Sequence, residues 1–230
     1  MYEKGDIATL TFYFIYVIMT TRYHEDTHRK ETIMKAIDFF KSYQALFEQP
    51  DILAVFKKVW KKREDFTKSV MPHIASILSE HGYAGEHQYE YYKIDVIGWK
   101  SCKENLADLP KPGSYALKEH FWYLGVAVEH ENDPYDWTDE LVKLLYINCP
   151  LRIVIGYYPE TLLPYELEQT IDYASKMVAM ANEKKDLVRA DQEYLLILGK
   201  NHADTENLSK ETYSAYVYDC EQKRFKPLNR

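Results

Sequence analysis

The sequence is poor in cysteine, glycine and proline, and its apolar runs are short. Its three cysteines lie far apart without a CxxC pair, which is typical of reduced thiols in the cytoplasm rather than of a disulfide framework. Eight glycines and nine prolines are too few for a disordered or fibrous chain. The apolar segment at residues 7–19 spans 13 residues, whereas a membrane helix needs roughly 20. No basic stretch precedes this segment, so it does not match a signal peptide. We therefore expect a cytoplasmic protein without membrane contact.

The sequence also lacks an excess of positive charge and the common nucleotide and hydrolase motifs. Its 29 basic and 36 acidic residues give a net charge of -7, and there is neither a glycine-rich phosphate loop nor a GxSxG elbow. Basic residues gather only in KKVWKKRE, residues 57–64, around Trp60. They are Lys57, Lys58, Lys61, Lys62 and Arg63. This basic segment is either a solvated helix face or a surface for phosphate contacts.

Two periodicities in the chain predict its secondary structure. Apolar residues at helical spacing predict helices over residues 30–48, 52–66, 72–82, 136–145 and 164–184. Runs rich in aromatic and β-branched residues predict strands at residues 87–99, 120–131, 149–158 and 193–200, and an edge strand or hairpin at the end of the chain. The clearest predicted loop lies at residues 106–114.

The order of these elements predicts an α/β fold with a mixed central sheet flanked by helices. A strand–helix–strand unit over residues 149–200 implies parallel neighbours, whereas the strands at 87–99 and 120–131 are expected to be antiparallel. We expect one domain over residues 1–230. It comprises a helical N-terminal region at 1–74, a core at 75–200 and a C-terminal hairpin or edge strand at 201–230.

The stretch GVAVEHENDP, residues 125–134, places two glutamates at the end of a predicted strand. Because side chains alternate along a strand, Glu129 and Glu131 point to one face and His130 to the other. Asp95, on the preceding strand, is expected to join them if the two strands are neighbours. Three carboxylates would form an oxygen-rich site for Mg²⁺ or Mn²⁺. A solvated turn is the alternative interpretation. We expect His130 to be a surface or packing residue.

These residues give the chain a resemblance to the PD-(D/E)XK nuclease superfamily, which has the restriction-endonuclease-like fold. The family pattern is a helix, an aspartate on one strand, D/E-x-K on the next, then helix–strand–helix–strand, and it is similar to residues 75–200 here. Asp95 matches the aspartate and Glu129 the first position of the second motif. Glu131 stands where lysine is expected, as in the ExE variant of some restriction enzymes. Lys93 is a candidate for the missing lysine, and Glu80 for the glutamate that the preceding helix often adds.

The resemblance implies metal-dependent hydrolysis of DNA phosphodiester bonds. Asp95, Glu129 and Glu80 would be ligands of Mg²⁺ or Mn²⁺, Glu131 would lie near the attacking water, and Lys93 would supply the lysine. RNA is left open as a substrate, and many nucleases of this fold act as homodimers. A nuclease fold retained as a DNA-binding or assembly module without catalysis is the alternative function.

A second motif, HEDTH at residues 24–28, has the HExxH spacing of zinc proteases. His24 and His28 would bind zinc, Glu25 would act as the general base, and Glu48 could be a third ligand. Charged residues within and after the motif, and the short chain before it, favour a solvated turn instead.

Overall fold

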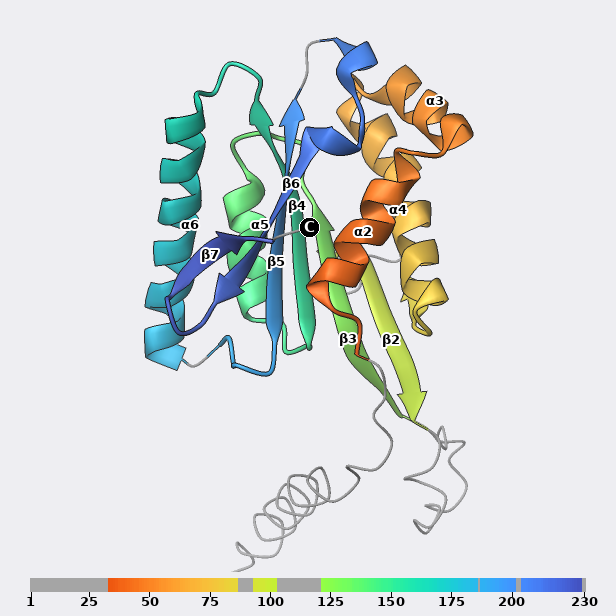
Figure 1. Cartoon of the computed structure of the whole chain (residues 1–230). Helices are drawn as coiled ribbons and strands as arrows, with labels where there is room; N and C mark the ends of the chain where they lie inside the picture. The colour runs from red at the N-terminus through yellow and green to blue at the C-terminus, as the bar shows by residue number, and fades with distance from the viewer. Residues whose placement is uncertain (1–32, 87–92, 103–120, 186, 202–203, 229–230) are drawn as a thin grey trace, which may run out of the picture. The chain divides into compact units, whose positions relative to one another are not determined.

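The strands that the structure describes form one mixed sheet in the order β1-β2-β3-β4-β5-β6-β7 (Figure 1). They are β1 (Ala84–Glu86), β2 (Val96–Cys102), β3 (Phe121–His130), β4 (Leu151–Pro159), β5 (Glu193–Asn201), β6 (Tyr213–Asp219) and β7 (Arg224–Pro227). This computed structural model describes residues 33–86, 93–102, 121–185, 187–201 and 204–228. All elements described below belong to the unit Met34–Arg230.

The sheet is antiparallel at both edges and parallel at its centre. β1, β2 and β3 pair antiparallel, β3, β4 and β5 pair parallel, and β5, β6 and β7 pair antiparallel. The predicted α/β class with a mixed sheet is therefore confirmed, as are the antiparallel β2–β3 pair and the parallel β4–β5 pair. The predicted C-terminal hairpin is formed by β6 and β7.

Helices cover both faces of the sheet (Figure 1). On one face lie α2 (Ala36–Leu46), α3 (Pro50–Val59) and α4 (Arg63–Glu80), and on the other lie α5 (Trp137–Leu145) and α6 (Pro164–Lys185). Because side chains alternate between the two faces along each strand, the core consists of one apolar cluster on each face of the sheet. In β3, Val126 and Val128 pack on the α2–α4 side, whereas Ala127 packs on the α5–α6 side. Both faces are buried, which explains why the central strands are apolar almost throughout.

The helix predicted over residues 52–66 is two helices, which corrects the sequence interpretation. The chain turns after Val59 because Trp60 is buried, with its ring centroid 4.8 Å from Phe66 and 5.5 Å from Tyr157. The next helix, α4, starts at Arg63 and continues through Pro72, where the sequence had predicted a new helix start. Burial of the apolar face of α4 therefore outweighs the backbone hydrogen bond that a proline inside a helix removes.

The structure also shifts the first predicted strand of the core. Within the predicted range 87–99, β2 begins only at Val96, and it runs on to Cys102. Lys93 has a φ of 59°, a left-handed conformation that is incompatible with a strand. Residues 87–92 and the predicted loop at 106–114 lie outside the described residues.

The HEDTH motif at residues 24–28 lies outside the described residues as well. Glu48, its suggested third ligand, forms an exposed ion pair with Lys210 at 2.5 Å. None of the helices in the described ranges is both long enough and apolar enough to cross a bilayer.

Candidate functional site

Two carboxylates meet where β2 begins and β3 ends. The β2–β3 register pairs Val96 with Val128, so its continuation by one residue sets Asp95 opposite Glu129. The backbone N–H of His130 donates to Asp95 Oδ2 at 2.8 Å, which fixes the aspartate against the end of β3. Side chains directly opposite each other on antiparallel strands have Cβ atoms about 5 Å apart. The structure therefore brings Asp95 and Glu129 together on the sheet face that α5 covers.

Helix α5 adds a lysine and a third acid to this pair. Lys143 Nζ lies 2.8 Å from Glu129 Oε1 and also forms an ion pair with Glu140, one turn earlier on α5. The same ammonium donates to the carbonyl oxygen of Lys93 at 2.9 Å. The sequence interpretation missed Lys143 and Glu140. The signal that could have found them is an acid and a lysine three residues apart on the helix that follows the glutamate strand.

Burial dominates the electrostatics of this carboxylate cluster. Only 2% of the Glu129 side chain is exposed. Burial raises the pKa of Glu129 to about 9; the contact with Lys143 opposes this rise, and the charges of Asp95 and Glu140 add to it. Burial also raises the pKa of Asp95. For Lys143, burial lowers the pKa, but the contacts with Glu129 and Glu140 outweigh it and the pKa is raised overall.

Two buried oxygens of the cluster indicate what it can bind. Glu129 Oε1 and Glu140 Oε2 have no directed hydrogen-bond donor, so their short contacts with Lys143 are ionic. The ammonium of Lys143 therefore occupies the position beside these two oxygens that a bound cation could take. Asp95 and Glu129 supply two carboxylates, and Mg²⁺ in proteins commonly binds through one or two carboxylates together with waters and substrate phosphate.

The predicted set of three carboxylates is not assembled. Among the described residues, no group of three or more His, Cys, Asp and Glu side chains is arranged to hold a metal ion. Glu131 lies beyond the end of β3, and its Oε1 accepts a hydrogen bond from the backbone N–H of Asp133 at 2.6 Å. Glu131 therefore stabilises the turn into α5, instead of completing the site with Asp95 and Glu129.

The positions of Lys93 and Glu80 also correct the sequence interpretation. Lys93 precedes β2 in a left-handed conformation with an exposed side chain, so it does not share a strand face with Asp95. Its backbone carbonyl, rather than its ammonium, contacts the cluster. Glu80 ends α4, which packs on the opposite sheet face. The end of α4 that approaches β3 carries Thr67, 3.3 Å from His130, and Glu80 lies about 20 Å further along the helix. Glu80 cannot be a ligand of this site.

His130 is a packing residue and not a surface residue, the two roles that the sequence had left open for it. Its side chain is buried on the α2–α4 side, with Nδ1 3.3 Å from Thr67 Oγ1 and Nε2 3.0 Å from the Tyr157 hydroxyl. Burial lowers its pKa to about 3. The imidazole is therefore neutral at physiological pH and belongs to a buried network of neutral groups.

The start of α4 brings the basic segment to the same end of the sheet. Arg63 Nη1 lies 2.5 Å from Asp133 Oδ2, and Asn132 Nδ2 donates to the Arg63 carbonyl at 2.9 Å. Both partners belong to the loop that follows β3. Arg63 therefore sits only a few residues from the end of the strand that carries Glu129.

The four lysines of the basic segment differ in their contacts. Lys57 forms an ion pair with Glu206 at 2.9 Å, and Lys62 lies 3.8 Å from a neighbouring aspartate. Lys58 and Lys61 are exposed. Part of the segment therefore has a structural role, and the rest presents positive charge to solvent.

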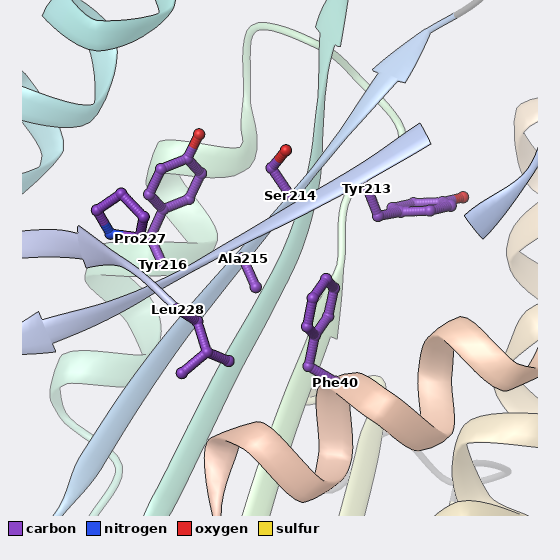
Figure 2. Close-up of a pocket in the computed structure, with 7 residues that line it drawn as sticks. All are labelled: Phe40, Tyr213, Ser214, Ala215, Tyr216, Pro227 and Leu228. Carbon is purple, nitrogen blue, oxygen red and sulfur yellow. The ribbon is translucent and has the colours of Figure 1, made fainter. Parts of the chain in front are cut away.

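The cavity drawn in Figure 2 lies elsewhere and has a different character. It has a volume of about 170 Å³ and lies between α2 and the β6–β7 hairpin, where Phe40 points toward β6 (Figure 2). Its lining residues are Phe40, Tyr213, Ser214, Ala215, Tyr216, Pro227 and Leu228. Since none of them carries a charge at neutral pH, this cavity does not compete with the carboxylate cluster as a catalytic site.

Comparison of the chain with protein-family models, curated proteins and solved structures gave no match.

Proposed function

We propose that this protein is a divalent-metal-dependent nuclease with a restriction-endonuclease-like fold, which hydrolyses phosphodiester bonds of DNA. One observation carries the proposal. Asp95, just before β2, and Glu129, at the end of β3, face each other in a buried cluster that also contains Lys143. An opposed aspartate and glutamate on two adjacent strands are the acidic pair of the PD-(D/E)XK pattern.

The order and pairing of the elements support this proposal. The helix α4 precedes β1, β2 and β3, which pair antiparallel, and α5 then leads to β4, which is parallel to β3. This succession agrees with the pattern of a helix, an aspartate strand, a glutamate strand and a following helix–strand–helix–strand.

The two carboxylates would hold Mg²⁺ or Mn²⁺. When bound, the ion lowers the pKa of a coordinated water and offsets charge on the phosphate. Asp95 is already oriented by the His130 backbone, so its oxygen is positioned before any ligand binds. Because burial raises the pKa of Glu129 to about 9, a bound ion would displace the proton that Glu129 holds at neutral pH.

Lys143 can supply the lysine that the family pattern places at the position of Glu131. It contacts Glu129 and Glu140 from α5, and the Lys93 carbonyl holds it in place. An ammonium fixed beside the acidic pair can stabilise negative charge that develops on a phosphate during hydrolysis. Lys143 therefore takes the role that the sequence interpretation assigned to Lys93.

The basic segment supports a nucleic acid as the substrate. Arg63 lies at the end of β3, and exposed Lys58 and Lys61 belong to the same segment. Lysine and arginine side chains contact phosphates and position a duplex without reading its sequence. They would compensate locally for the net charge of -7.

A plasmid-nicking assay tests the proposal. With Mg²⁺ or Mn²⁺, the wild-type protein is expected to convert supercoiled plasmid into open-circular or linear DNA, and EDTA is expected to stop the reaction. Asp95→Asn and Glu129→Gln preserve side-chain shape while removing a ligand charge, and each is expected to abolish cleavage.

Glu80→Gln is the matched control, because this glutamate lies on the opposite sheet face and at the far end of α4. It should cut like the wild type. Cleavage that persists in Asp95→Asn and Glu129→Gln would come from a contaminant or another site, and would refute the proposal.

An inactive DNA-binding or assembly module is the second candidate function. The observation that favours it is the ion pair between Lys143 and Glu129, which offers the buried carboxylate a cation without a metal. Such a module would bind plasmid without nicking it and would give no heat on titration with Mn²⁺. A nuclease would give both signals, so the two measurements separate the candidates.

A further inference from the structure

A buried arginine on β4 takes no part in the proposed nuclease site. Arg152 is 1% exposed, and its guanidinium carbon lies 5.9 Å from the ring centroid of Tyr194 on the α5–α6 side of the sheet. Arginine keeps its positive charge even in protein interiors. A buried charge is costly unless it is paired with an opposite charge and hydrogen-bonded.

The contacts of Arg152 supply hydrogen bonds but no counter-charge. Nε donates to the Ile147 carbonyl at 2.6 Å, and Nη2 donates to the Leu187 carbonyl at 2.9 Å and to Gln192 Oε1 at 3.0 Å. All three acceptors are neutral. Nη1 has no acceptor in hydrogen-bond geometry, the neutral Cys149 thiol interacts with the guanidinium, and no carboxylate in the described ranges forms an ion pair with it. Nη1 therefore lacks a directed acceptor, and the positive charge lacks an opposite charge.

A cavity of about 210 Å³ adjoins this arginine at the amino ends of β4 and β5. Its lining residues are Leu145, Tyr146, Asn148, Arg152, Leu187, Arg189 and Gln192. None of them is acidic. Arg189 adds a second guanidinium, with 54% of its side chain exposed. Because one water takes about 30 Å³ of liquid, the cavity has room for a small oxyanion with some of its waters.

We propose that this cavity binds a small oxyanion, either inorganic phosphate or a terminal phosphate monoester, between buried Arg152 and exposed Arg189. Planar guanidinium groups match phosphate oxygens with charge-assisted hydrogen bonds. The site goes beyond the proposed nuclease function. It lies at the amino ends of β4 and β5, whereas Asp95 and Glu129 meet at the carboxyl end of β3.

A purely structural role accounts for the hydrogen bonds of two of the three guanidinium nitrogens of Arg152. Its Nε and Nη2 tie the loop before β4 to the loop before β5 through Ile147, Leu187 and Gln192. That role leaves Nη1 without an acceptor and the positive charge of Arg152 without an opposite charge. The Asp191 carboxylate would compete weakly with an oxyanion for Arg189, because Arg189 Nε lies 3.5 Å from Asp191 Oδ1. Asp191 is exposed, so it can be replaced without disturbing the core.

Calorimetric titration of the full chain with inorganic phosphate, in EDTA and at constant ionic strength, tests the proposal. The phosphate site predicts saturable binding by the wild type. Arg189→Gln is expected to weaken binding about three- to fivefold, since it removes one charged contact at a solvent-exposed position. Asp191→Asn is expected to tighten binding about twofold, since it removes the competing carboxylate. A parallel titration with ribose 5-phosphate shows whether the site accepts a monoester or only the free ion.

Arg152→Gln is expected to abolish binding, and the two exposed variants keep the test valid if that protein fails to fold. Arg224→Gln, on the edge strand β7, is the matched arginine control and should bind like the wild type. A wild type that binds neither ligand overturns the proposal. So does an affinity that Arg189→Gln and Asp191→Asn leave unchanged, or one that a Lys58→Gln, Lys61→Gln double variant abolishes, since phosphate would then be held by the basic segment.

Discussion

Glu129 and His130 are consecutive residues of one strand, yet their side chains lie on opposite faces of the sheet. Both are almost fully buried, with 1% and 4% exposure. Burial favours the neutral form of each, so the pKa of Glu129 rises to about 9 and that of His130 falls to about 3. Their neighbours differ. Glu129 faces the charged ammonium of Lys143, whereas His130 faces the neutral hydroxyls of Thr67 and Tyr157. The α5–α6 side of the strand end therefore carries a cluster of ionisable groups, here called the charged face, whereas the α2–α4 side carries a network of neutral groups.

After the loss of cleavage expected for the two carboxylate variants, the largest effect is expected from removing Lys143, the lysine of the charged face. Lys143→Met is expected to lower plasmid nicking by about 100- to 1,000-fold, because it would remove the fixed charge that we propose stabilises the phosphate transition state. The measurement is the initial rate of nicking at saturating Mg²⁺. Lys176→Met, an exposed lysine of α6, is the matched control. Unchanged cleavage by Lys143→Met would mean that the α5 lysine plays no part in catalysis.

The pH dependence of stability should differ between the two faces, beginning with Glu129. Its pKa of about 9 in the folded state exceeds the ordinary value of 4.5. The folded protein therefore holds a proton that the unfolded chain has lost, and this contribution to stability disappears as pH rises toward 9. Relative to the wild type, Glu129→Gln should gain roughly 2 to 3 kcal/mol in unfolding free energy between pH 6 and pH 8. Urea denaturation in EDTA measures the unfolding free energies of both proteins. A difference between them that stays constant with pH would contradict the raised pKa of Glu129.

His130 should show the opposite sign over a lower range. Its folded-state pKa of about 3 lies below the ordinary value of 6.5, so the unfolded chain binds the extra proton and stability falls as pH decreases below 6.5. The wild type should lose roughly 2 kcal/mol relative to His130→Gln between pH 7.5 and pH 5. The same denaturation series measures it. Parallel pH profiles of the two proteins would show that the imidazole is protonated in the fold.

The smallest expected effect concerns the basic segment beside both faces. Arg63→Gln should weaken DNA binding only a few-fold, and should reduce the slope of log affinity against log salt by about 1 if Arg63 contacts one phosphate. Fluorescence anisotropy with a labelled duplex at several salt concentrations measures this slope. Arg224→Gln should leave it unchanged, and an equal change in both variants would remove any special role for the basic segment.

Strand periodicity was enough to predict that Glu129 and His130 point to opposite faces of the sheet, but not the partners that each side chain meets there. Two-residue alternation assigned them to opposite faces, and the expectation that two successive strands pair brought Asp95 to Glu129. These are local rules, and apolar residues such as Val126 and Val128 keep the register from slipping.

Residues contributed by helices were harder to predict. Lys143 reaches the cluster because of the way α5 docks on the sheet, and the spacing of Glu140 and Lys143 marks the pair as a candidate without specifying that docking. Glu80 was wrongly included because sequence order does not reveal which face α4 covers or which of its ends approaches β3. Lys93 was misjudged because its positive φ interrupts the alternation, and Trp60 because its burial turns the chain between two helices.

Calorimetric titration with Mn²⁺ at pH 8 tests most directly whether Asp95 and Glu129 share a cation. The wild type is expected to bind one ion per chain, Asp95→Asn and Glu129→Gln to bind none, and Glu80→Gln to match the wild type. A wild type that gives no binding heat, or an Asp95→Asn protein that binds Mn²⁺ as tightly as the wild type, would contradict the account.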